Sequence, residues 1–416
     1  MPRIVYDISI TMSNKFNSGI QRVVLNLAKE IFENPEFKDC ELIVVIRNQK
    51  IFGKKEFLIV DTETLNQRIG LTQKDNDTPF STKEKTLSLI RRSNLLSKAL
   101  DSTLIFAGLR RYQDWRGFRN FIIHSKKTQR KFTFSAGDTY LTADAFWSRS
   151  SVVARIRSLK RAGVKIAILV HDIFPATNPE WFYSSDVKIF RRNFPKVINE
   201  ADFLFSVSSF TAKEVLGSYP SAVRAKVIRM GMARVESLKD VPNLSLDAEE
   251  NLIFVGTLEP RKNYEQILEW LTIIDWQGQV NIFGRKGWKS EGILLAINEA
   301  RQKGLDIVWH ENATDFQLRG FINSKTIGVC ASLSEGYGLP LREFRTIGIG
   351  VVASRIPAFV EGDIDQGVRF FDLTDISSFR EALNDLRNRE AISRFIYPTW
   401  KESLQDILMG IKSNAI

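Results

Sequence analysis

Two glutamates eight residues apart have a spacing that suits binding to two parts of one ligand. Glu335 and Glu343 lie in the stretch LSEGYGLPLREF, directly after the apolar run Ile327–Ala331. The pattern predicts a buried strand, a glycine-containing turn and a helix whose first residue is Pro340. One carboxylate can then reach a bound sugar while the other reaches a ribose. The alternative is structural: an acidic residue before a turn, and Glu343 in the first helical turn, where it favours the helix dipole.

The turn between these glutamates is a predicted anion site. Backbone N–H groups at the start of a helix lack partners within the helix, and the helix dipole adds positive potential there. We therefore expect the turn to hold a phosphate. The amides concerned belong to Gly336, Tyr337, Gly338 and Leu339.

A second candidate is the basic pair in FVGTLEPRKNYEQI, residues 254–267. We expect a strand, a loop and a helix, with Arg261 and Lys262 at the start of the helix. Positive charge there opposes the helix dipole at a cost of up to about 1 kcal/mol, so the pair suggests a bound anion. Both cations converging on a diphosphate would stabilise a departing leaving group without a metal. The alternative is a plain surface pair.

The third candidate is His171 in LVHDIFPATNPEWF, residues 169–182. His171, one of three histidines in the chain, follows a predicted buried strand, where ligands bind in open α/β sheets. With Asp172 beside it, His171 can carry a proton or donate a hydrogen bond to a sugar hydroxyl. A structural histidine is the alternative.

We expect no obligatory metal ion and no disulfide. Two Asp-x-Asp pairs, at residues 75–77 and 363–365, lie in loop-like sequence without a convincing strand before them, which favours chance. Cys40 and Cys330 lie far apart and neither belongs to a CxxC pair, so they form neither a disulfide framework nor a zinc site. A reducing cytoplasm fits this usage best.

The elements that would position these residues alternate along the chain. Short β-branched runs followed by amphipathic helical stretches predict βαβ units and parallel sheets. A strand is expected over Arg3–Ile10, and a helix with one apolar stripe from Gly19. The other strands expected in the first half are Glu41–Ile46, Val164–Val170 and Phe203–Val207. Those in the second half are Leu252–Val255, Val280–Phe283, Asp306–Trp309, Ile327–Ala331 and Val351–Ala353.

A chain of 416 residues is longer than one hydrophobic core usually grows, so we expect two domains. The predicted fold class is α/β, with two Rossmann-like, doubly wound parallel sheets. A polar stretch interrupts the alternation and suggests a linker, and a last amphipathic helix is expected to pack back toward the first domain. The expected bounds are 1–236, 237–250 for the linker, 251–398, and 399–416 for the last helix.

Most of the excess positive charge lies in one segment. The net charge is +11, and residues 83–131 hold thirteen Lys and Arg against three Asp and Glu. Interleaved apolar and aromatic residues suit an anionic membrane surface; a solvated basic face is the alternative, and nucleic acid is the least favoured partner. No apolar run reaches the roughly 18 residues of a membrane span, and the start lacks signal-peptide features. We expect a cytoplasmic protein, at most peripheral at the inner face of the membrane.

Six ordered segments resemble the retaining glycosyltransferases of family 4. These enzymes have the GT-B fold, two Rossmann-like domains that face each other across a cleft. Together the segments are far more specific than a single glycine motif, although residues 48–131 match nothing in the family. The matching segments are SGIQRV around Gly19, HDIFPATNPEWF, VSSFTAKEV at 207–215, VGTLEPRKN at 255–263, FGRKGW at 283–288 and the E-x7-E motif from Glu335 to Glu343.

The resemblance implies a role for each matching residue. Glu335 would contact the donor sugar, the amides after it would contact the sugar and phosphate, and Glu343 would bind the ribose. Arg261 and Lys262 would hold the diphosphate. His171 would lie near the transferred sugar.

Gly19 would let the first-domain loop approach the donor phosphate. Many relatives have two glycines in this loop, whereas here Gln21 fills a position that often holds the second. This departure puts the approach of the phosphate at that loop in doubt.

The implied activity is transfer of a hexose or deoxyhexose, with mannose or rhamnose favoured, from a nucleotide diphosphate sugar to a glycan or lipid-linked glycan in bacterial surface polysaccharide synthesis. GDP-mannose or dTDP-rhamnose is the favoured donor, and a UDP-sugar is also open. Transfer would retain configuration, the leaving phosphate itself deprotonating the acceptor. The alternatives are a nucleotide-sugar epimerase or phosphorylase on the same fold, and a non-catalytic basic scaffold that binds a membrane.

Overall fold

The computed structural model divides into two compact units, Met1–Ala145 and Phe146–Ile416. The described residues are 3–13, 18–37, 41–47, 56–66, 130–232, 250–361, 366–388 and 392–413. The expected linker apart from its last residue, nearly all of the basic segment and both Asp-x-Asp pairs therefore lie outside the described residues.

The first unit is built on strands in the order β4-β3-β2-β1-β5. β1 pairs in parallel with β2 and β5, whereas β3 pairs antiparallel with β2 and β4. The expected parallel sheet thus has an antiparallel edge, because the nine residues between β2 and β3 are too few for the crossover that parallel strands need. The strands are β1 (Ile4–Asp7), β2 (Leu42–Arg47), β3 (Phe57–Ile59), β4 (Lys131–Phe132) and β5 (Thr139–Thr142).

β1 ends three residues earlier than the sequence predicted. The carboxylate of Asp7, the last residue of β1, accepts a hydrogen bond from the amide of Ser9 at 2.9 Å. Helix α1 (Ser9–Ser13) begins at that residue. The polar pair therefore turns the chain before the apolar residues that follow can extend the strand.

Helix α2 (Gly19–Glu33) begins at the predicted glycine. The side-chain oxygen of Gln21 accepts a hydrogen bond from the amide of Ser18 at 2.8 Å, which is one half of a capping box. The residue that occupies the position of a second glycine thus satisfies an N–H group at the start of the helix.

In the second unit the parallel strands β6, β7 and β8 precede a parallel six-stranded sheet of order β11-β10-β9-β12-β13-β14. The first three strands are β6 (Lys165–Val170), β7 (Phe203–Ser206) and β8 (Lys226–Val227). The six-stranded sheet consists of β9 (Asn251–Val255), β10 (Gln279–Phe283), β11 (Ile307–His310), β12 (Thr326–Cys330), β13 (Gly350–Ser354) and β14 (Val368–Phe371). The five strands predicted here are confirmed to within a residue at each end, and β14 was not predicted.

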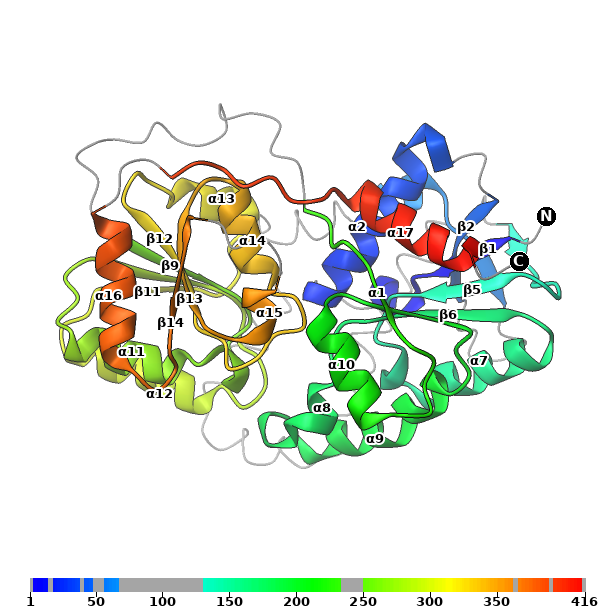
Figure 1. The fold of residues 1–416 in the computed structure, drawn as a ribbon, viewed down its shortest axis with the longest axis horizontal. Helices are drawn as coiled ribbons and strands as arrows, with labels where there is room; N and C mark the ends of the chain where they lie inside the picture. The colour runs from blue at the N-terminus through cyan, green and yellow to red at the C-terminus, as the bar shows by residue number, and fades with distance from the viewer. Residues whose placement is uncertain are drawn as a thin grey trace, which may run out of the picture. The chain divides into compact units, whose positions relative to one another are not determined.

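Helices cover both faces of the six-stranded sheet, as expected for a doubly wound fold (Figure 1). One core contains Leu252 and Phe254 of β9 with α11, α12 and α16, and the other contains Ile253 with α14 and α15. The helices are α7 (Ser150–Arg161), α8 (Phe174–Thr177), α9 (Ser184–Ile198), α10 (Ser209–Ser218), α11 (Tyr264–Ile273), α12 (Glu291–Gln302), α13 (Asp315–Gly320), α14 (Leu339–Thr346), α15 (Pro357–Val360), α16 (Ile376–Arg387) and α17 (Trp400–Ser413).

The last helix, α17, lies against β7. A Cβ atom at Gly410 would come within 2.5 Å of the ring of Phe205, so the absence of a side chain lets the helix approach the strand. Arg229 adds a two-pronged ion pair with Asp406, with nitrogen–oxygen distances of 2.7 and 3.0 Å. Both contacts lie within the second unit, and they fix α17 beside the strand and not on the six-stranded sheet.

A buried carboxyl group lies at the end of β5 in the first unit. Asp144 is 1% exposed and accepts hydrogen bonds from the amide of Thr11 at 2.7 Å and its hydroxyl at 3.0 Å. Burial raises the pKa of Asp144 to about 6, and the nearby charge of Asp7 raises it too, although the hydrogen bonds oppose the rise.

We predict that Asp144→Asn removes a pH dependence of stability. Because the folded chain raises this pKa from 3.8 to about 6, the stability that the bound proton contributes is full below pH 4 and lost as the pH rises through 6. The difference corresponds to about 3 kcal/mol. As the pH rises from below 4 to above 6, the free energy of unfolding of the wild type should fall by that amount relative to that of the asparagine variant. Unfolding by urea at several pH values measures both. An identical difference between the two proteins at acid and neutral pH would contradict the prediction.

Candidate functional site

The site is built where two neighbouring parallel strands end. β9 and β12 pair side by side, with Ile253 opposite Gly328, so their carboxyl ends lie at the same edge of the sheet. The loop after β9 carries Arg261 and Lys262, and the loop after β12 carries Glu335. A hydrogen bond from the amide of Leu333 to the carbonyl of Arg261, at 2.8 Å, joins the two loops.

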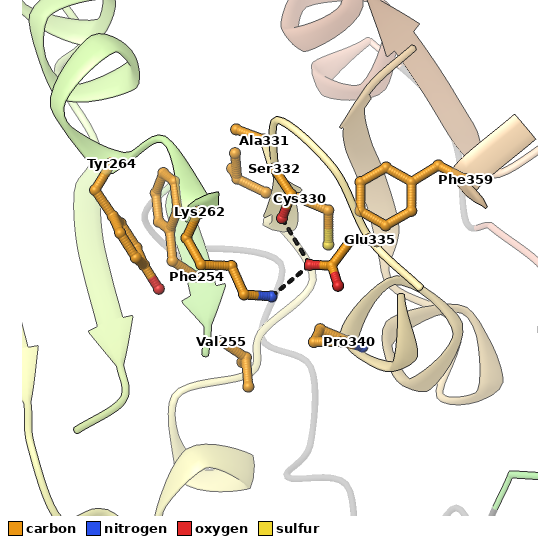
Figure 2. A pocket seen from close by; sticks show the side chains of 11 residues that line it. Phe254, Val255, Lys262, Tyr264, Cys330, Ala331, Ser332, Glu335, Pro340 and Phe359 are labelled. Atoms are coloured by element: carbon orange, nitrogen blue, oxygen red, sulfur yellow. Dashed lines mark hydrogen bonds and ion pairs between the residues drawn. The ribbon is translucent and has the colours of Figure 1, made fainter. Parts of the chain in front are cut away.

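Glu335 forms ion pairs with both predicted cations. Its carboxylate oxygens lie 2.5 Å from the Arg261 guanidinium and 2.7 Å from the Lys262 ammonium. The hydroxyl of Ser332 donates a further hydrogen bond to it at 2.8 Å, and Glu259 binds the other side of Arg261 at 2.5 Å. Two carboxylates thus balance two cations within one group, which we call the ion-pair cluster. Figure 2 shows the part of it formed by Glu335, Lys262 and Ser332.

The cluster is removed from water, and this determines its titration. The side chain of Glu335 is 9% exposed, and those of Arg261 and Lys262 are 17% and 12% exposed. Burial alone would raise the pKa of Glu335, but the charges of Arg261 and Lys262 outweigh it and lower the pKa to about 2. Glu335 is therefore ionised at any physiological pH, as a carboxylate between two cations should be.

The basic pair does not lie at the start of a helix as predicted. Arg261 and Lys262 lie in a separate 3-10 turn, Pro260–Lys262, and α11 begins only at Tyr264. Asn263 separates the two elements with a left-handed φ of 58°. The expected opposition to the helix dipole is therefore wrong, and the anion that lies between the two cations is the carboxylate of Glu335.

The turn after Glu335 presents amides that the described chain leaves unbonded. Within the described residues, no backbone or side-chain oxygen accepts from the amides of residues 336–339. α14 begins at Leu339, one residue before Pro340, and Gly338 adopts a left-handed φ of 84° before it. The predicted arrangement of a turn, a helix start and free N–H groups is present. Glu343 consequently lies in the second turn of the helix, not the first as predicted, and is half-buried.

Gly336 brings this turn against the end of β6. A Cβ atom there would lie 1.9 Å from the carbonyl oxygen of His171, so the position has no room for a side chain. The hydroxyl of Ser208 donates to the Gly336 carbonyl at 2.5 Å, and Thr211 donates to the carbonyls of both Gly336 and His171 at 3.3 Å. These bonds fix the turn at the loops after β6 and β7.

The two remaining predicted residues, His171 and Gly19, lie in different units. His171 is 7% exposed and follows β6, beside the turn that Gly336 begins. Gly19 is exposed at the start of α2, in the first unit, whereas the ion-pair cluster lies in the second. Its proposed approach to a phosphate therefore stays a prediction.

Three residues that sequence reasoning did not select contribute to the site. Glu259 is 2% exposed and, two residues before Arg261, was readable as its partner. Ser332 gave no signal, because a serine before an acidic turn is common. Asp172 was noticed only as a neighbour of His171, although its carboxylate lies near the ion-pair cluster.

A pocket opens beside Glu335 (Figure 2). Its walls come from the ends of β9 and β12, the start of α14 and the ring of Phe359, and the side chains of Lys262 and Glu335 reach its polar side. Among the described residues, no three His, Cys, Asp or Glu side chains gather into a metal-binding group. No helix in the described part of the chain has both the length and the apolar character needed to cross a bilayer.

Comparison with known proteins identifies the second sheet and its loops. Residues 238–395 match the family model described as glycosyl transferases group 1. The chain is 27% identical over 304 residues to the serotype-specific mannosyltransferase WbdA of Escherichia coli, which covers 66% of this chain and 36% of WbdA. It is 24% identical over 211 residues to the O-antigen chain mannosyltransferase B of Escherichia coli, covering 48% and 55% of the two chains. The chain thus spans about a third of the length of WbdA.

A solved structure extends the likeness to the whole chain. HepE of Anabaena, in complex with UDP and glucose, superposes with a TM-score of 0.57 at 12% sequence identity and covers 100% of this chain and 98% of its own. At this identity the likeness concerns the fold. It confirms the predicted α/β class with two doubly wound sheets, the GT-B fold.

We predict that Lys262→Met destabilises the protein, because it leaves part of the buried charge of Glu335 without a partner. The expected loss in the free energy of unfolding is about 3 kcal/mol. The double variant Lys262→Met with Glu335→Gln should lose less than the sum of the two single changes, by about 1–3 kcal/mol. Urea unfolding of the four proteins measures this coupling.

Lys303→Met is the matched control, since Lys303 is exposed at the end of α12 and should change stability by no more than about 0.5 kcal/mol. Strict additivity of the two cluster variants would show that the ion pair makes no energetic contribution.

Proposed function

We propose that the protein is a hexosyltransferase that moves a mannosyl group from a nucleotide diphosphate sugar to a glycan in O-antigen synthesis. The match of residues 238–395 to the family model of the glycosyl transferases group 1 supports this activity. The observation that carries the proposal is the meeting of Arg261, Lys262 and Glu335 at the ends of two adjacent strands. The mannosyltransferase names of two relatives support the choice of sugar.

The ion-pair cluster suits a donor diphosphate. Both cations are rigidly held and shielded from water, where their attraction for a developing phosphate charge is stronger than in solvent. A diphosphate would take the place that the Glu335 carboxylate holds between them. Glu335 would then turn its oxygens to hydroxyls of the donor sugar, and the unbonded amides of residues 336–339 would bind the phosphate and sugar.

We propose transfer with retention of configuration. In this scheme the leaving phosphate, stabilised by Arg261 and Lys262, deprotonates the acceptor hydroxyl on the face from which it departs. No side-chain base is then required. His171 would lie near the transferred sugar and donate a hydrogen bond to it, and exclusion of water would limit hydrolysis of the donor.

GDP-mannose is the donor that we favour, with dTDP-rhamnose and UDP-sugars as alternatives. Glu343 would bind the ribose from α14, and Gly19 would let the loop before α2 approach a donor phosphate. HepE was solved with UDP and glucose, which supports a nucleotide sugar site on this fold. We propose no obligatory metal ion.

The acceptor is proposed to be a glycan or lipid-linked glycan bound by the first domain, residues 1–236, with the donor bound by residues 251–398. The basic segment 83–131 would attach the enzyme to anionic lipid at the inner face of the cytoplasmic membrane. Residues 83–129 of this segment lie outside the described residues.

We predict that one nucleotide sugar stabilises the protein in the presence of EDTA. A donor at about 100 times its Kd adds about 2.7 kcal/mol to stability, which is visible as a rise in Tm. GDP-mannose, dTDP-rhamnose and UDP-glucose would each be tested by thermal shift, and release of the nucleotide would then be measured with glycan acceptors. Lys262→Ala should abolish the shift, while Lys303→Ala should retain it. A protein that no donor stabilises, or a Lys262→Ala variant that responds like the wild type, would refute the proposed site.

A further inference from the structure

One carboxylate near the ion-pair cluster forms no ion pair with any cation of the described residues. Asp172 follows His171 at the end of β6, and its Cβ lies 3.5 Å from the place that a Cβ of Gly336 would occupy. Among the described residues its carboxylate accepts one long hydrogen bond, from the amide of Phe174 at 3.4 Å, and forms no ion pair within 4.0 Å. The ring of Phe174 in turn lies 5.5 Å from the Arg261 guanidinium.

The charges of the ion-pair cluster act on Asp172. Burial raises the pKa of Asp172 to about 6, the charge of Arg261 opposes the rise, and those of Glu259 and Glu335 add to it. A half-buried carboxylate with one weak hydrogen bond costs stability, and a structural role would provide it with donors. Asp172 therefore has free capacity to accept hydrogen bonds at the edge of the proposed donor site.

The chemistry of a nucleotide diphosphate sugar restricts which part can meet this carboxylate. A diphosphate carries acceptors and negative charge, so it would be repelled by Asp172. The hydroxyl groups of a hexose are donors and can each give a hydrogen bond to a carboxylate oxygen. The charge of Glu335, the proposed sugar ligand, also acts on Asp172 and raises its pKa. Two carboxylates near the pocket would then bracket one sugar.

We infer that Asp172 accepts a hydrogen bond from a hydroxyl group of the donor hexose and contributes to the recognition of that sugar. The inference rests on the proposed function, because it takes the bound ligand to be a nucleotide diphosphate sugar. It assigns Asp172 to the sugar alone and leaves the diphosphate to Arg261 and Lys262. Loss of Asp172 should therefore weaken binding of the nucleotide sugar without weakening binding of the bare nucleotide.

The test compares the Kd of the sugar nucleotide with that of its bare nucleotide diphosphate. Of GDP-mannose, dTDP-rhamnose and UDP-glucose, the one that stabilises the wild type most would be titrated by calorimetry, followed by GDP, dTDP or UDP accordingly. Asp172→Asn keeps the size of the side chain, and Asp172→Ala removes its polar group. Asp186→Asn, an exposed carboxylate in the first turn of α9, is the matched control.

The preference is the Kd of the bare nucleotide divided by the Kd of the sugar nucleotide. In both Asp172 variants we expect this ratio to fall by about 10- to 100-fold. The Kd of the bare nucleotide should not rise more than about 3-fold above that of the wild type, which also shows that each variant is folded, and Asp186→Asn should match the wild type throughout. An unchanged preference in both variants would overturn the inference while leaving the proposed function intact. A wild type that binds none of the donors or nucleotides would overturn the proposed function and this inference with it.

Discussion

The double ion pair of Glu335 with Arg261 and Lys262 is the interaction on which the rest of the site depends. Two cations buried side by side would repel each other and lose their hydration, so they are stable together only with anions between them. Glu335 and Glu259 supply that charge in this structure. The same requirement makes the place attractive to a diphosphate, which carries at least as much negative charge as the carboxylate it would replace.

Backbone geometry places these charges. β9 and β12 are adjacent, so the loops after them must meet, although 73 residues separate Lys262 from Glu335 in the chain. The 3-10 turn and the left-handed Asn263 hold the two cations outside α11. Gly336 allows the turn after Glu335 to pack against the His171 carbonyl, which brings Asp172 to the same cluster. Gly336 tolerates little change, because the backbone carbonyl of His171, and not a flexible side chain, fills the space that a Cβ atom would need.

Local patterns in the sequence predicted most of the strands and helices. They did not predict most of the contacts between residues far apart in the chain. Five of the strands of the six-stranded sheet and the start of α2 were predicted because apolar periodicity reports burial directly, whereas β14 was not. β1 was overextended because the turn at Ser9 depends on a hydrogen bond to Asp7 that apolar periodicity does not encode. Arg261, Lys262 and Glu335 were each selected from their own motif. The sequence did not predict that Glu335 is itself the anion between the two cations. That prediction needs the pairing of β9 with β12, which no single motif contains.

In the proposed site Glu335 and a diphosphate compete for Arg261 and Lys262, and the affinity of a bare nucleotide diphosphate tests this competition most directly. The measurement is the Kd of GDP, dTDP or UDP, whichever the wild type binds, for the wild type and for Glu335→Gln by calorimetry at neutral pH. Neutralising Glu335 removes the carboxylate that pairs with both cations, while Glu259 stays paired with Arg261. The variant should therefore bind the nucleotide about 10-fold more tightly, a gain of about 1.4 kcal/mol. An equal or weaker affinity in Glu335→Gln would show that the diphosphate does not bind where Glu335 lies, and would contradict the account.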